Sequence, residues 1–222
     1  MKDNIERGKR FYQAKLYDLA VKEFKRSGEE ASENKELAYY LGLALTKLKR
    51  YDEALLYLEQ VESVSLGFLH INQCRIIRGY IYSKTGRLHL AEFEFKRVIG
   101  EGILSRQIFA SLGHVSYLMK HLDASIEYLK KSLNIDSEYP CALNSLGYIY
   151  AEEEIDKKQA LTMCRKAVKS RPDNPSYLDS YGWANYKNGR IKEARDNLRK
   201  ALHLFPGNKD IANHLKIVIS KL

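Results

Sequence analysis

The chain has 222 residues, of which 45% are hydrophobic, 11% aromatic and 29% charged, a composition typical of a folded protein and not of a disordered one. Its net charge of +9 would suit nucleic acid, anionic lipid or acidic peptides as partners, or would simply reflect a solvated face rich in lysine. The three cysteines form no CxxC pair and no run of about twenty apolar residues occurs, so the sequence indicates no disulfide framework, no zinc site and no membrane span.

A glycine recurs at intervals of 34, 37, 34, 34 and 35 residues, as Gly8, Gly42, Gly79, Gly113, Gly147 and Gly182. A small residue follows twelve or thirteen positions later, as Ala20, Ala54, Ala91, Ser125, Ala160 and Ala194. A larger residue follows after four more, as Phe24, Leu58, Phe95, Leu129, Cys164 and Leu198. Small residues at this spacing let two helices approach closely while the larger ones fill the gaps, so the pattern predicts six copies of one helical hairpin.

Each hairpin is predicted to contain a first helix, A, and a second helix, B. The A helices are predicted at about 3–14, 35–48, 72–85, 106–119, 140–153 and 175–188. The B helices are predicted at about 17–28, 51–62, 88–100, 122–134, 157–170 and 191–204. The last segment, 209–222, has an apolar face made of Ile211, Leu215, Val218, Ile219 and Leu222. Because stacked repeats must cover their last apolar face, we expect this segment to be a capping helix.

The last two hairpins carry the clearest signature. The fifth contains NSLGYIY and ends in RPDNP, and the sixth contains DSYGWANY and ends in LFPGN, where Pro206 stops the B helix. With the period of about 34 residues and the small-residue positions, these residues resemble the tetratricopeptide repeat. The resemblance implies an all-α fold, a right-handed α-solenoid superhelix, in a single domain over 1–222. Its repeats would span about 1–34, 35–71, 72–105, 106–139, 140–174 and 175–208, followed by the cap over 209–222.

The junction between the second and third hairpins departs most from this pattern. The 37-residue interval adds three residues in the segment 63–72, SVSLGFLHIN, which is unusually apolar for a connection. Arg78 also stands where a leucine is expected, just before the glycine. We therefore expect a local irregularity near residues 63–80. We expect the apolar loop Leu66–Ile71 to tuck under this junction, and the alternative is a second docking surface or a self-association patch.

No catalytic or cofactor-binding motif occurs in the chain. It contains no HExxH, no GxxxxGK[ST], no GxGxxG after a strand and no GxSxG. The six histidines never fall at i, i+4 spacing, and carboxylates lie beside lysines, as in Lys192–Glu193, where solvated ion pairs explain them. Cys164 takes the place of a core leucine and is expected to be inert. We therefore predict a non-enzymatic protein that holds no metal and no cofactor.

In proteins that contain tetratricopeptide repeats, the A helices line a concave groove that holds an extended or helical peptide of a protein partner. Transferring the family's contact positions, which are 2, 5, 6, 9, 12 and 13 of each repeat, predicts an aromatic groove. Its predicted members are Tyr12, Tyr39, Tyr40, Tyr80, His114, Tyr117, Asn144, Tyr148, Asp179, Trp183, Tyr186 and Lys187. The aromatic residues would anchor apolar side chains and bond the peptide backbone, and the alternative for each is packing between neighbouring A helices. The lysine–asparagine clamp with which some members bind acidic chaperone tails is absent, which disfavours a chaperone co-factor.

Two other functions stay open. Basic residues gather on the B helices, among them Lys22, Lys96, Lys130, Arg165 and Arg199, and the resemblance places these helices on the convex side. Such a face would suit nucleic acid or an anionic surface, although interleaved glutamates and the lack of aromatic residues there disfavour nucleic acid. Stacking repeats can also continue between chains, which would make the protein a self-associating structural element.

The leading prediction is a scaffold that recruits a protein partner. The fifth and sixth hairpins resemble the repeats of bacterial proteins that assemble envelope and motility complexes, so assembly of such a complex is its expected context. The N-terminal stretch MKDNIERGKRFYQ has no apolar signal core, which favours a cytoplasmic protein. A periplasmic or envelope-associated location stays open if a signal segment has been removed.

Overall fold

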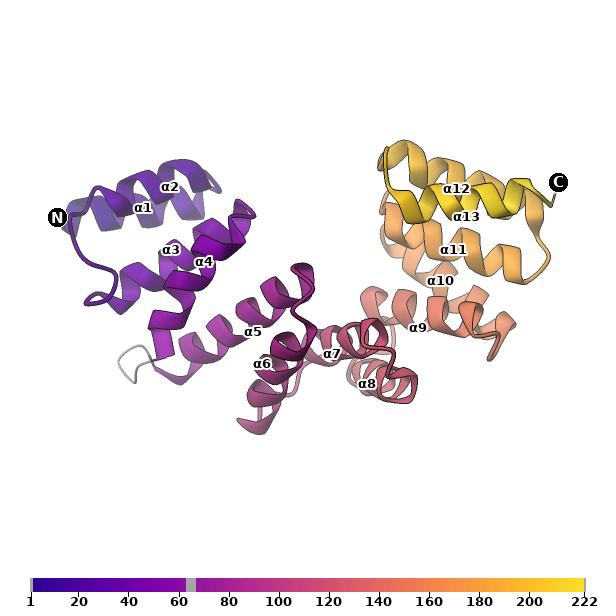
Figure 1. The fold of residues 1–222 in the computed structure, drawn as a ribbon, viewed down its shortest axis with the longest axis horizontal. Coiled ribbons are helices and arrows are strands. Elements are labelled where there is room, and N and C mark those ends of the chain that lie inside the picture. The colour runs from indigo at the N-terminus through magenta and orange to yellow at the C-terminus, as the bar shows by residue number, and fades with distance from the viewer. Residues whose placement is uncertain (1, 63–66, 222) are drawn as a thin grey trace. The chain divides into compact units, whose positions relative to one another are not determined.

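The computed structural model describes residues 2–62 and 67–221, and within these ranges it contains thirteen α-helices, one short 3-10 helix and no strand (Figure 1). The helices form two compact units, an N-terminal unit, Met1–Ile103, and a C-terminal unit, Leu104–Leu222. The border falls between the third and fourth predicted hairpins. The prediction of an all-α helical repeat fold is confirmed, and a single domain over the whole chain stays a prediction.

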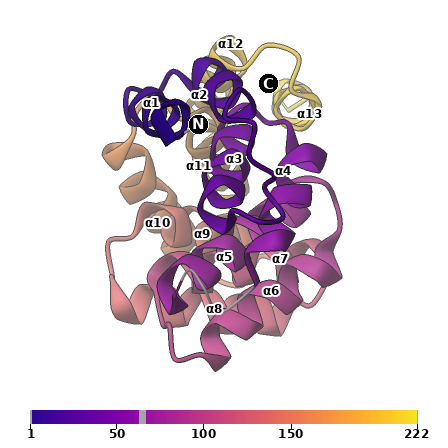
Figure 2. The same ribbon diagram turned by 90° about the vertical axis from the view of Figure 1, so that its left-hand side faces the viewer.

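The N-terminal unit consists of three helical hairpins. They are α1 (Lys2–Gln13) with α2 (Tyr17–Lys25), α3 (Lys35–Lys47) with α4 (Tyr51–Leu58) and its 3-10 extension η1 (Glu59–Glu62), and α5 (Phe68–Lys84) with α6 (Leu88–Gly100). Helices α1 and α2 lie side by side in both ribbon views (Figures 1 and 2). The predicted helix over 51–62 is thus an α-helix that tightens into a 3-10 turn at its end.

The C-terminal unit consists of three more hairpins and a final helix. They are α7 (Arg106–Leu118) with α8 (Leu122–Ile135), α9 (Pro140–Glu152) with α10 (Lys157–Ser170), α11 (Pro175–Lys187) with α12 (Ile191–Leu204), and then α13 (Lys209–Ile219). The turn between α11 and α12 passes through Gly189 at φ 77°, a left-handed conformation that glycine adopts without strain. Lys120 and Glu154 take the corresponding turn positions at φ 66° and 54°. All six predicted hairpins are therefore present.

Close packing within each hairpin follows the glycine pattern. A Cβ atom at Gly182 would lie 2.7 Å from Cγ of Leu198 and 3.2 Å from the backbone oxygen of Ala194. Ala194 and Leu198 are fully buried. In the α7–α8 hairpin Ser125 replaces the alanine, and its hydroxyl donates to the backbone oxygen of Gly113 at 2.6 Å. The small residues therefore do let the two helices approach closely, as their spacing predicts.

A buried ion pair replaces apolar packing in the α5–α6 hairpin. The guanidinium of Arg78, which is 2% exposed, donates to the two carboxylate oxygens of Glu94 at 2.9 and 3.2 Å. It also donates to the backbone oxygen of Leu58 at 3.2 Å. The first hairpin has an arginine and a glutamate at the same spacing, with Arg7 3.7 Å from the buried carboxylate of Glu23. The departure at Arg78 is thus an ion pair in place of a leucine contact.

The segment before α5 differs from the prediction. Helix α5 begins at Phe68 and not at 72, directly after Gly67, which turns the chain at φ 78°. Phe68 and Leu69 are 50% and 75% exposed. The expectation that they tuck under the junction is therefore wrong, because they form the first turn of a helix that leaves them in solvent. Leu66 lies outside the described residues.

Helix α13 covers the last hairpin. Its N-cap is Asn208, whose Oδ1 accepts the backbone N–H of Ile211 at 2.9 Å. Ile211 and Val218 are 3% and 0% exposed and pack against side chains of α11 and α12. Ile219, which was expected on the same face, is 45% exposed because it is the last residue of the helix. Leu222 lies outside the described residues, so the covering face is narrower than predicted.

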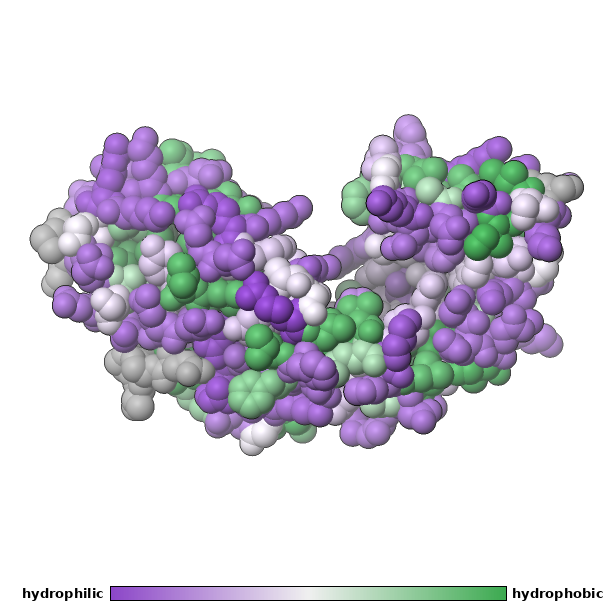
Figure 3. Space-filling model, viewed as in Figure 1, coloured by the Kyte–Doolittle hydropathy of each residue, from purple (hydrophilic) through white to green (hydrophobic). Residues whose placement is uncertain are grey.

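The surface is mixed in polarity. On the face shown in Figure 3, apolar residues are interspersed with hydrophilic ones. Exposed apolar side chains occur in both units, among them Leu56 and Phe93 in the N-terminal unit and Leu104 in the C-terminal unit. Within residues 2–62 and 67–221, no helix is long and apolar enough to cross a membrane.

Candidate functional site

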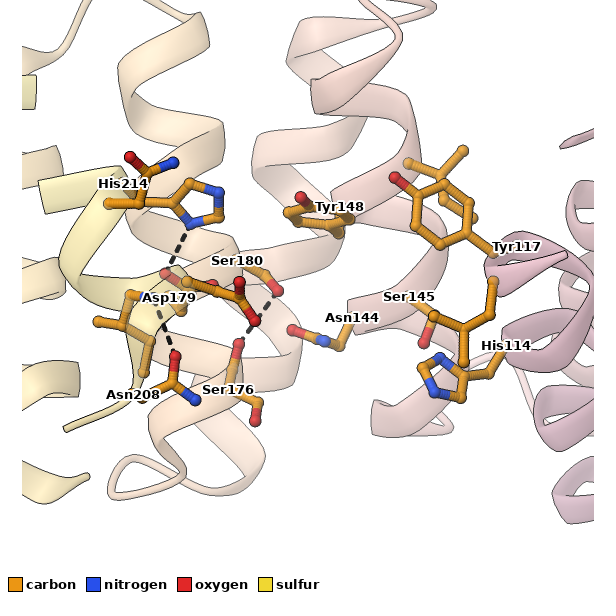
Figure 4. A pocket seen from close by; sticks show the side chains of 15 residues that line it. His114, Tyr117, Asn144, Ser145, Tyr148, Ser176, Asp179, Ser180, Asn208 and His214 are labelled. Carbon is orange, nitrogen blue, oxygen red and sulfur yellow. Dashed lines mark hydrogen bonds and ion pairs between the residues drawn. The ribbon is translucent and has the colours of Figure 1, made fainter. Parts of the chain in front are cut away.

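A groove of about 330 Å³ opens within the C-terminal unit, between the A helices of its three hairpins and α13 (Figure 4). Helices α7 and α9 contribute His114, Tyr117, Leu118, Asn144, Ser145, Tyr148 and Ile149. Helices α11 and α13, with the residue before α13, contribute Ser176, Asp179, Ser180, Asn208, Asp210, Ile211, Asn213 and His214. Five predicted groove residues therefore lie together, namely His114, Tyr117, Asn144, Tyr148 and Asp179.

Four aromatic rings line this groove, those of His114, Tyr117, Tyr148 and His214. Tyr117 and Tyr148 meet edge to face with ring centroids 6.1 Å apart, and Tyr148 lies 6.2 Å from the imidazole of His214. Burial raises the pKa of Tyr148 well above its ordinary value, and nearby groups, including the carboxylates of Asp179 and Asp210, raise it further. Burial also raises the pKa of Tyr117. Both side chains are neutral phenols at physiological pH, as tyrosines of ordinary pKa also are.

Polar side chains line the rest of the groove. Nδ1 of His214 and Oδ1 of Asp179 are 2.9 Å apart, and only 12% and 13% of these two side chains is exposed. The hydroxyl of Ser180 donates to the backbone oxygen of Ser176 at 3.0 Å. Oδ1 of Asn144 is buried and has no hydrogen-bond partner among the described residues. Because a buried acceptor without a donor costs free energy, a donor from a ligand would be bound favourably there.

Trp183, which was predicted as a groove contact, supports the groove from within. It is 6% exposed, its ring stacks on the imidazole of His214 with centroids 4.2 Å apart, and its Nε1 donates to Oε2 of Glu152 at 2.5 Å. Tyr186 packs against the indole at 5.1 Å, and Nζ of Lys187 lies 5.4 Å from the indole centroid. The expectation that Trp183 itself is open to a partner is therefore corrected, since a residue of α13 covers it.

The predicted tyrosines of the N-terminal unit are not among the residues that line this groove. Tyr39 is 6% exposed, and its hydroxyl donates to Oε1 of Gln73 at 2.7 Å. Tyr40 meets Tyr39 and Tyr12 with ring centroids 5.3 and 6.0 Å apart. Tyr80 is 43% exposed. Packing between neighbouring helices, the alternative that the sequence left open, is therefore what the structure shows for Tyr39.

The sequence prediction omits α13 as a wall of the groove. Asp210, Asn213 and His214 occupy positions 2, 5 and 6 of a seventh repeat counted from residue 209. Continuing the count of contact positions by one repeat would have found them. Ser145 and Ser180 occupy position 6 of their own repeats and are also missing from the prediction.

The groove offers hydrogen bonds, carboxylates and aromatic faces. Among residues 2–62 and 67–221, no group of three or more His, Cys, Asp or Glu side chains could hold a metal ion. Cys164 is buried, and this burial raises the pKa of its thiol, so it stays protonated and unreactive. These properties suit binding of another molecule.

A family model of the tetratricopeptide repeat matches residues 5–63 and 156–209, more than half of the chain, and a second such model matches residues 107–139. The chain belongs to the tetratricopeptide repeat family. The matched stretches leave out 64–106, where Arg78 takes the place of a leucine. Tetratricopeptide repeat proteins mediate protein–protein interactions.

Two curated relatives are similar over different lengths. A tetratricopeptide repeat-containing protein of Pseudomonas aeruginosa is 42% identical over 74 residues, which is 33% of this chain and 12% of that protein. Another from Methanocaldococcus jannaschii is 25% identical over 224 residues, which is 93% of this chain and 39% of that protein. The chain thus spans less than half the length of either curated relative.

Solved structures share the tetratricopeptide repeat fold. A chain of the APC/C hetero-tetramer Cut9–Hcn1 aligns with a TM-score of 0.80 at 12% identity, over 97% of this chain and 42% of that one. A thermophilic tetratricopeptide repeat protein of Thermus thermophilus gives 0.64 at 18% identity, over 84% and 99%. YrrB, described as having an unusual peptide-binding site, gives 0.58 at 18% identity, over 90% and 98%.

Proposed function

We propose that the groove of the C-terminal unit binds an extended peptide segment of a protein partner, and that the protein acts as a non-enzymatic scaffold. The observation that carries the proposal is the convergence of polar and aromatic side chains from α7, α9, α11 and α13 on one cavity of about 330 Å³ (Figure 4). A family whose members mediate protein–protein interactions supports it, and one structural neighbour, YrrB, has a peptide-binding site.

Both kinds of backbone hydrogen bond can be made in this groove. The buried Oδ1 of Asn144 is an acceptor for a peptide N–H. The hydroxyl of Tyr117, a neutral phenol that interacts with the hydroxyl of Tyr148, is a donor for a peptide carbonyl. The half-buried ring of Tyr117 provides apolar contact at low cost in side-chain entropy. An extended peptide would therefore be held along its backbone, with the rings selecting its side chains.

Selection of a display library of random peptides on the full chain tests this function. Tyr117→Ala and Asn144→Ala are each expected to weaken binding of the selected peptides by about tenfold or more, since central interface contacts contribute about 1–2 kcal/mol or more. Tyr128→Ala on α8 is the matched control, because Tyr128 is half-buried in the same unit and does not line the groove. Far-UV circular dichroism verifies that all variants fold. Peptides that bind the two groove variants as tightly as the unchanged chain would overturn the proposal.

A second candidate function is binding of an anionic surface by the B-helix side of the C-terminal unit. Lys158, Arg165 and Arg190 line a separate pocket of about 350 Å³ together with Tyr181 and Asn188. All three cations are exposed, and within the described part of the chain none of them pairs with a carboxylate. Three unpaired cations around one pocket would attract phosphate groups.

A fluorescent single-stranded oligonucleotide, titrated at rising salt concentration, tests this second candidate. The variant Arg165→Gln with Arg190→Gln is expected to bind more weakly and to lower the slope of log affinity against log salt by about 1–2. Asn144→Ala is the control, since it changes the groove and leaves these cations in place. Absence of binding at low salt would contradict the candidate.

Self-association, and a role in assembling a bacterial envelope or motility complex, stay predictions. Phe68 and Leu69 of α5, at 50% and 75% exposure, are the side chains that a self-associating surface of the N-terminal unit would use. Sedimentation at two protein concentrations tests self-association, and a monomer at both concentrations would contradict it.

A further inference from the structure

The charged residues of the C-terminal groove are opposite in sign to the net charge of the chain. The chain has a net charge of +9. Among the described residues that line the groove, two are carboxylates, Asp179 and Asp210, and none is lysine or arginine. His114 and His214 also line it, and His214 is hydrogen-bonded to the carboxylate of Asp179 at 2.9 Å. The groove is therefore an acidic site on a basic protein.

Two acceptors in the groove have no partner among the described residues. Oδ1 of Asn144 is buried and has no donor among the described residues. Asp210 is exposed in the first turn of α13, and within the described part of the chain its carboxylate pairs with no cation. The hydroxyl of Ser180 already donates a hydrogen bond to the backbone oxygen of Ser176 in α11. A ligand that brings hydrogen-bond donors therefore finds acceptors without partners at Asn144 and Asp210.

Aromatic faces border these acceptors. Tyr117 and Tyr148 stand nearly perpendicular, at 86°, so the groove offers both an edge and a face. A cation within about 6 Å of a ring centroid is attracted by the ring. Burial is the main cause that raises the pKa of Tyr148, and Tyr117, Glu152, Asp179 and Asp210 add to it in that order, so the two groove carboxylates lie near this ring. A cation placed beside this ring would thus be attracted by the ring and by the two carboxylates.

We infer that the groove selects partner segments that carry a lysine or arginine side chain, held between Tyr148, Asp179 and Asp210. The inference rests on the proposed peptide-binding function. An ammonium or guanidinium group supplies donors to the acceptors that have no partner in the groove, and it gains from both carboxylates and the ring. An acidic peptide would bring like charges together and would be rejected.

The charge of the surrounding chain determines how this selection works. A basic peptide gains no long-range attraction from a chain of net charge +9, so the protein does not steer it toward the groove. Recognition is therefore short-ranged and acts once the cationic side chain has entered. For this reason we expect the cationic side chain to lengthen the lifetime of the complex more than it raises the rate of association.

The test uses a peptide selected from the random library on the full chain, together with a version in which its lysine or arginine is replaced by glutamine. Fluorescence anisotropy measures the affinity of both for the unchanged chain, Asp179→Asn and Asp210→Asn. We expect the cationic version to bind the unchanged chain about tenfold more tightly, and this ratio to fall to about threefold or less in Asp179→Asn. In Asp210→Asn, where the carboxylate is exposed, we expect an intermediate ratio.

Asp196→Asn is the matched control, because its side chain is 62% exposed on α12 outside the groove, and it should keep the full ratio. Two results would overturn the inference. In one, the selected peptides have no excess of lysine and arginine over the library, or are rich in acidic residues. In the other, replacement by glutamine changes affinity equally in every variant. If Tyr117→Ala still weakens binding in either case, the groove function stands without the inference. If it does not, the proposed function itself fails.

Discussion

Gly182 sets the distance between α11 and α12. A Cβ atom there would come within 2.7 Å of the Leu198 side chain and 3.2 Å of the backbone oxygen of Ala194. A flexible side chain can move aside, but a backbone oxygen inside a helix cannot. Any larger residue at this position therefore pushes the two helices apart and loosens contacts along the whole hairpin.

We expect Gly182→Ala to destabilise the protein by about 1–3 kcal/mol, even though alanine favours helix over glycine by about 1 kcal/mol. Urea unfolding followed by circular dichroism measures this change. Gly100→Ala in α6 is the control, because nothing lies within 4 Å of a Cβ atom at that position. That variant should be unchanged or slightly more stable. Equal losses in the two variants would contradict close approach as the cause.

The ion pair of Arg78 and Glu94 makes a second residue-scale prediction. We expect Glu94→Gln to destabilise the protein by about 3–5 kcal/mol, because it removes the carboxylate that accepts two hydrogen bonds from a guanidinium that is 2% exposed. Thermal unfolding followed by circular dichroism measures the loss. Glu101→Gln, whose carboxylate is 46% exposed beside Arg75, is the control and should cost about 1 kcal/mol or less. The double variant Arg78→Leu with Glu94→Met should recover most of the stability, and failure to do so would contradict the electrostatic cause.

Ionisation of Tyr39 is expected to lower the stability of the folded protein at alkaline pH. Burial is the main cause that raises the pKa of Tyr39 to about 12 in the folded protein, whereas a tyrosine in the unfolded chain has a pKa of about 10. Between these values the unfolded chain releases the proton while the folded chain keeps it, so rising pH favours unfolding. We expect the contribution of Tyr39 to be complete below about pH 10 and to be lost toward about pH 12. The free energy of unfolding, measured with urea at several pH values, should decline less in Tyr39→Phe than in the unchanged chain. Equal declines in the two proteins would contradict this prediction.

At the scale of elements, α13 links stability to binding. Its apolar side covers the last hairpin through Ile211 and Val218, and its polar side brings Asp210 and His214 into the groove. A substitution on the covered side therefore changes the groove without touching any residue that lines it. Trp183, the only tryptophan of the chain, reports on this link because it stacks on His214.

We expect Val218→Asp to detach α13, because it places an unpaired carboxylate at a position with 0% exposure, at a cost of several kcal/mol. Fluorescence of Trp183 should shift to longer wavelength, and the selected peptides should no longer bind. Ile219→Asp, one residue away and 45% exposed, is the matched control and should leave both signals unchanged. A shift of similar size in both variants would contradict a specific contact.

The elements differ in how far the sequence could predict them. The hairpins follow from the recurrence of glycine and alanine, because helix contact requires small residues at those positions in every repeat. The start of α5 could not be predicted in this way, since the sequence around Phe68 and Leu69 is compatible with a loop as well as with a helix. The burial of Trp183 depends on His214, which comes from the next element along the chain. A pattern within one repeat cannot show what the following helix covers.

At the scale of the whole molecule, the two compact units differ in how their interiors are stabilised. The N-terminal unit contains the buried carboxylates of Glu23 and Glu94 with their arginine partners. In the C-terminal unit the place of Arg78, just before the glycine, is taken by Leu112 and Leu146 in the first two hairpins, and both are buried. Since each repeat contacts only its neighbours, stability can differ along such a chain.

We therefore expect urea unfolding in two stages, with the N-terminal unit first. Circular dichroism, which sees all helices, should begin to change at lower urea than the fluorescence of Trp183, which sees only the C-terminal unit. Glu94→Gln should widen the gap between the two signals. Coincident transitions in both proteins would show instead that the chain unfolds as one cooperative body.

The position of α13 directly after α12 also constrains how this chain can change by duplication. His214 reaches Asp179 because one A helix follows the other without an intervening repeat. A copied hairpin inserted at residue 208 would keep every repeat well folded, yet it would give Asp179 a different neighbour and divide the acidic residues between two places. A copy inserted among the first three hairpins would leave them together. The three hairpins from α7 to α12 and α13 therefore form an indivisible block, and descendants that gain or lose repeats while keeping the groove should do so among the first three hairpins.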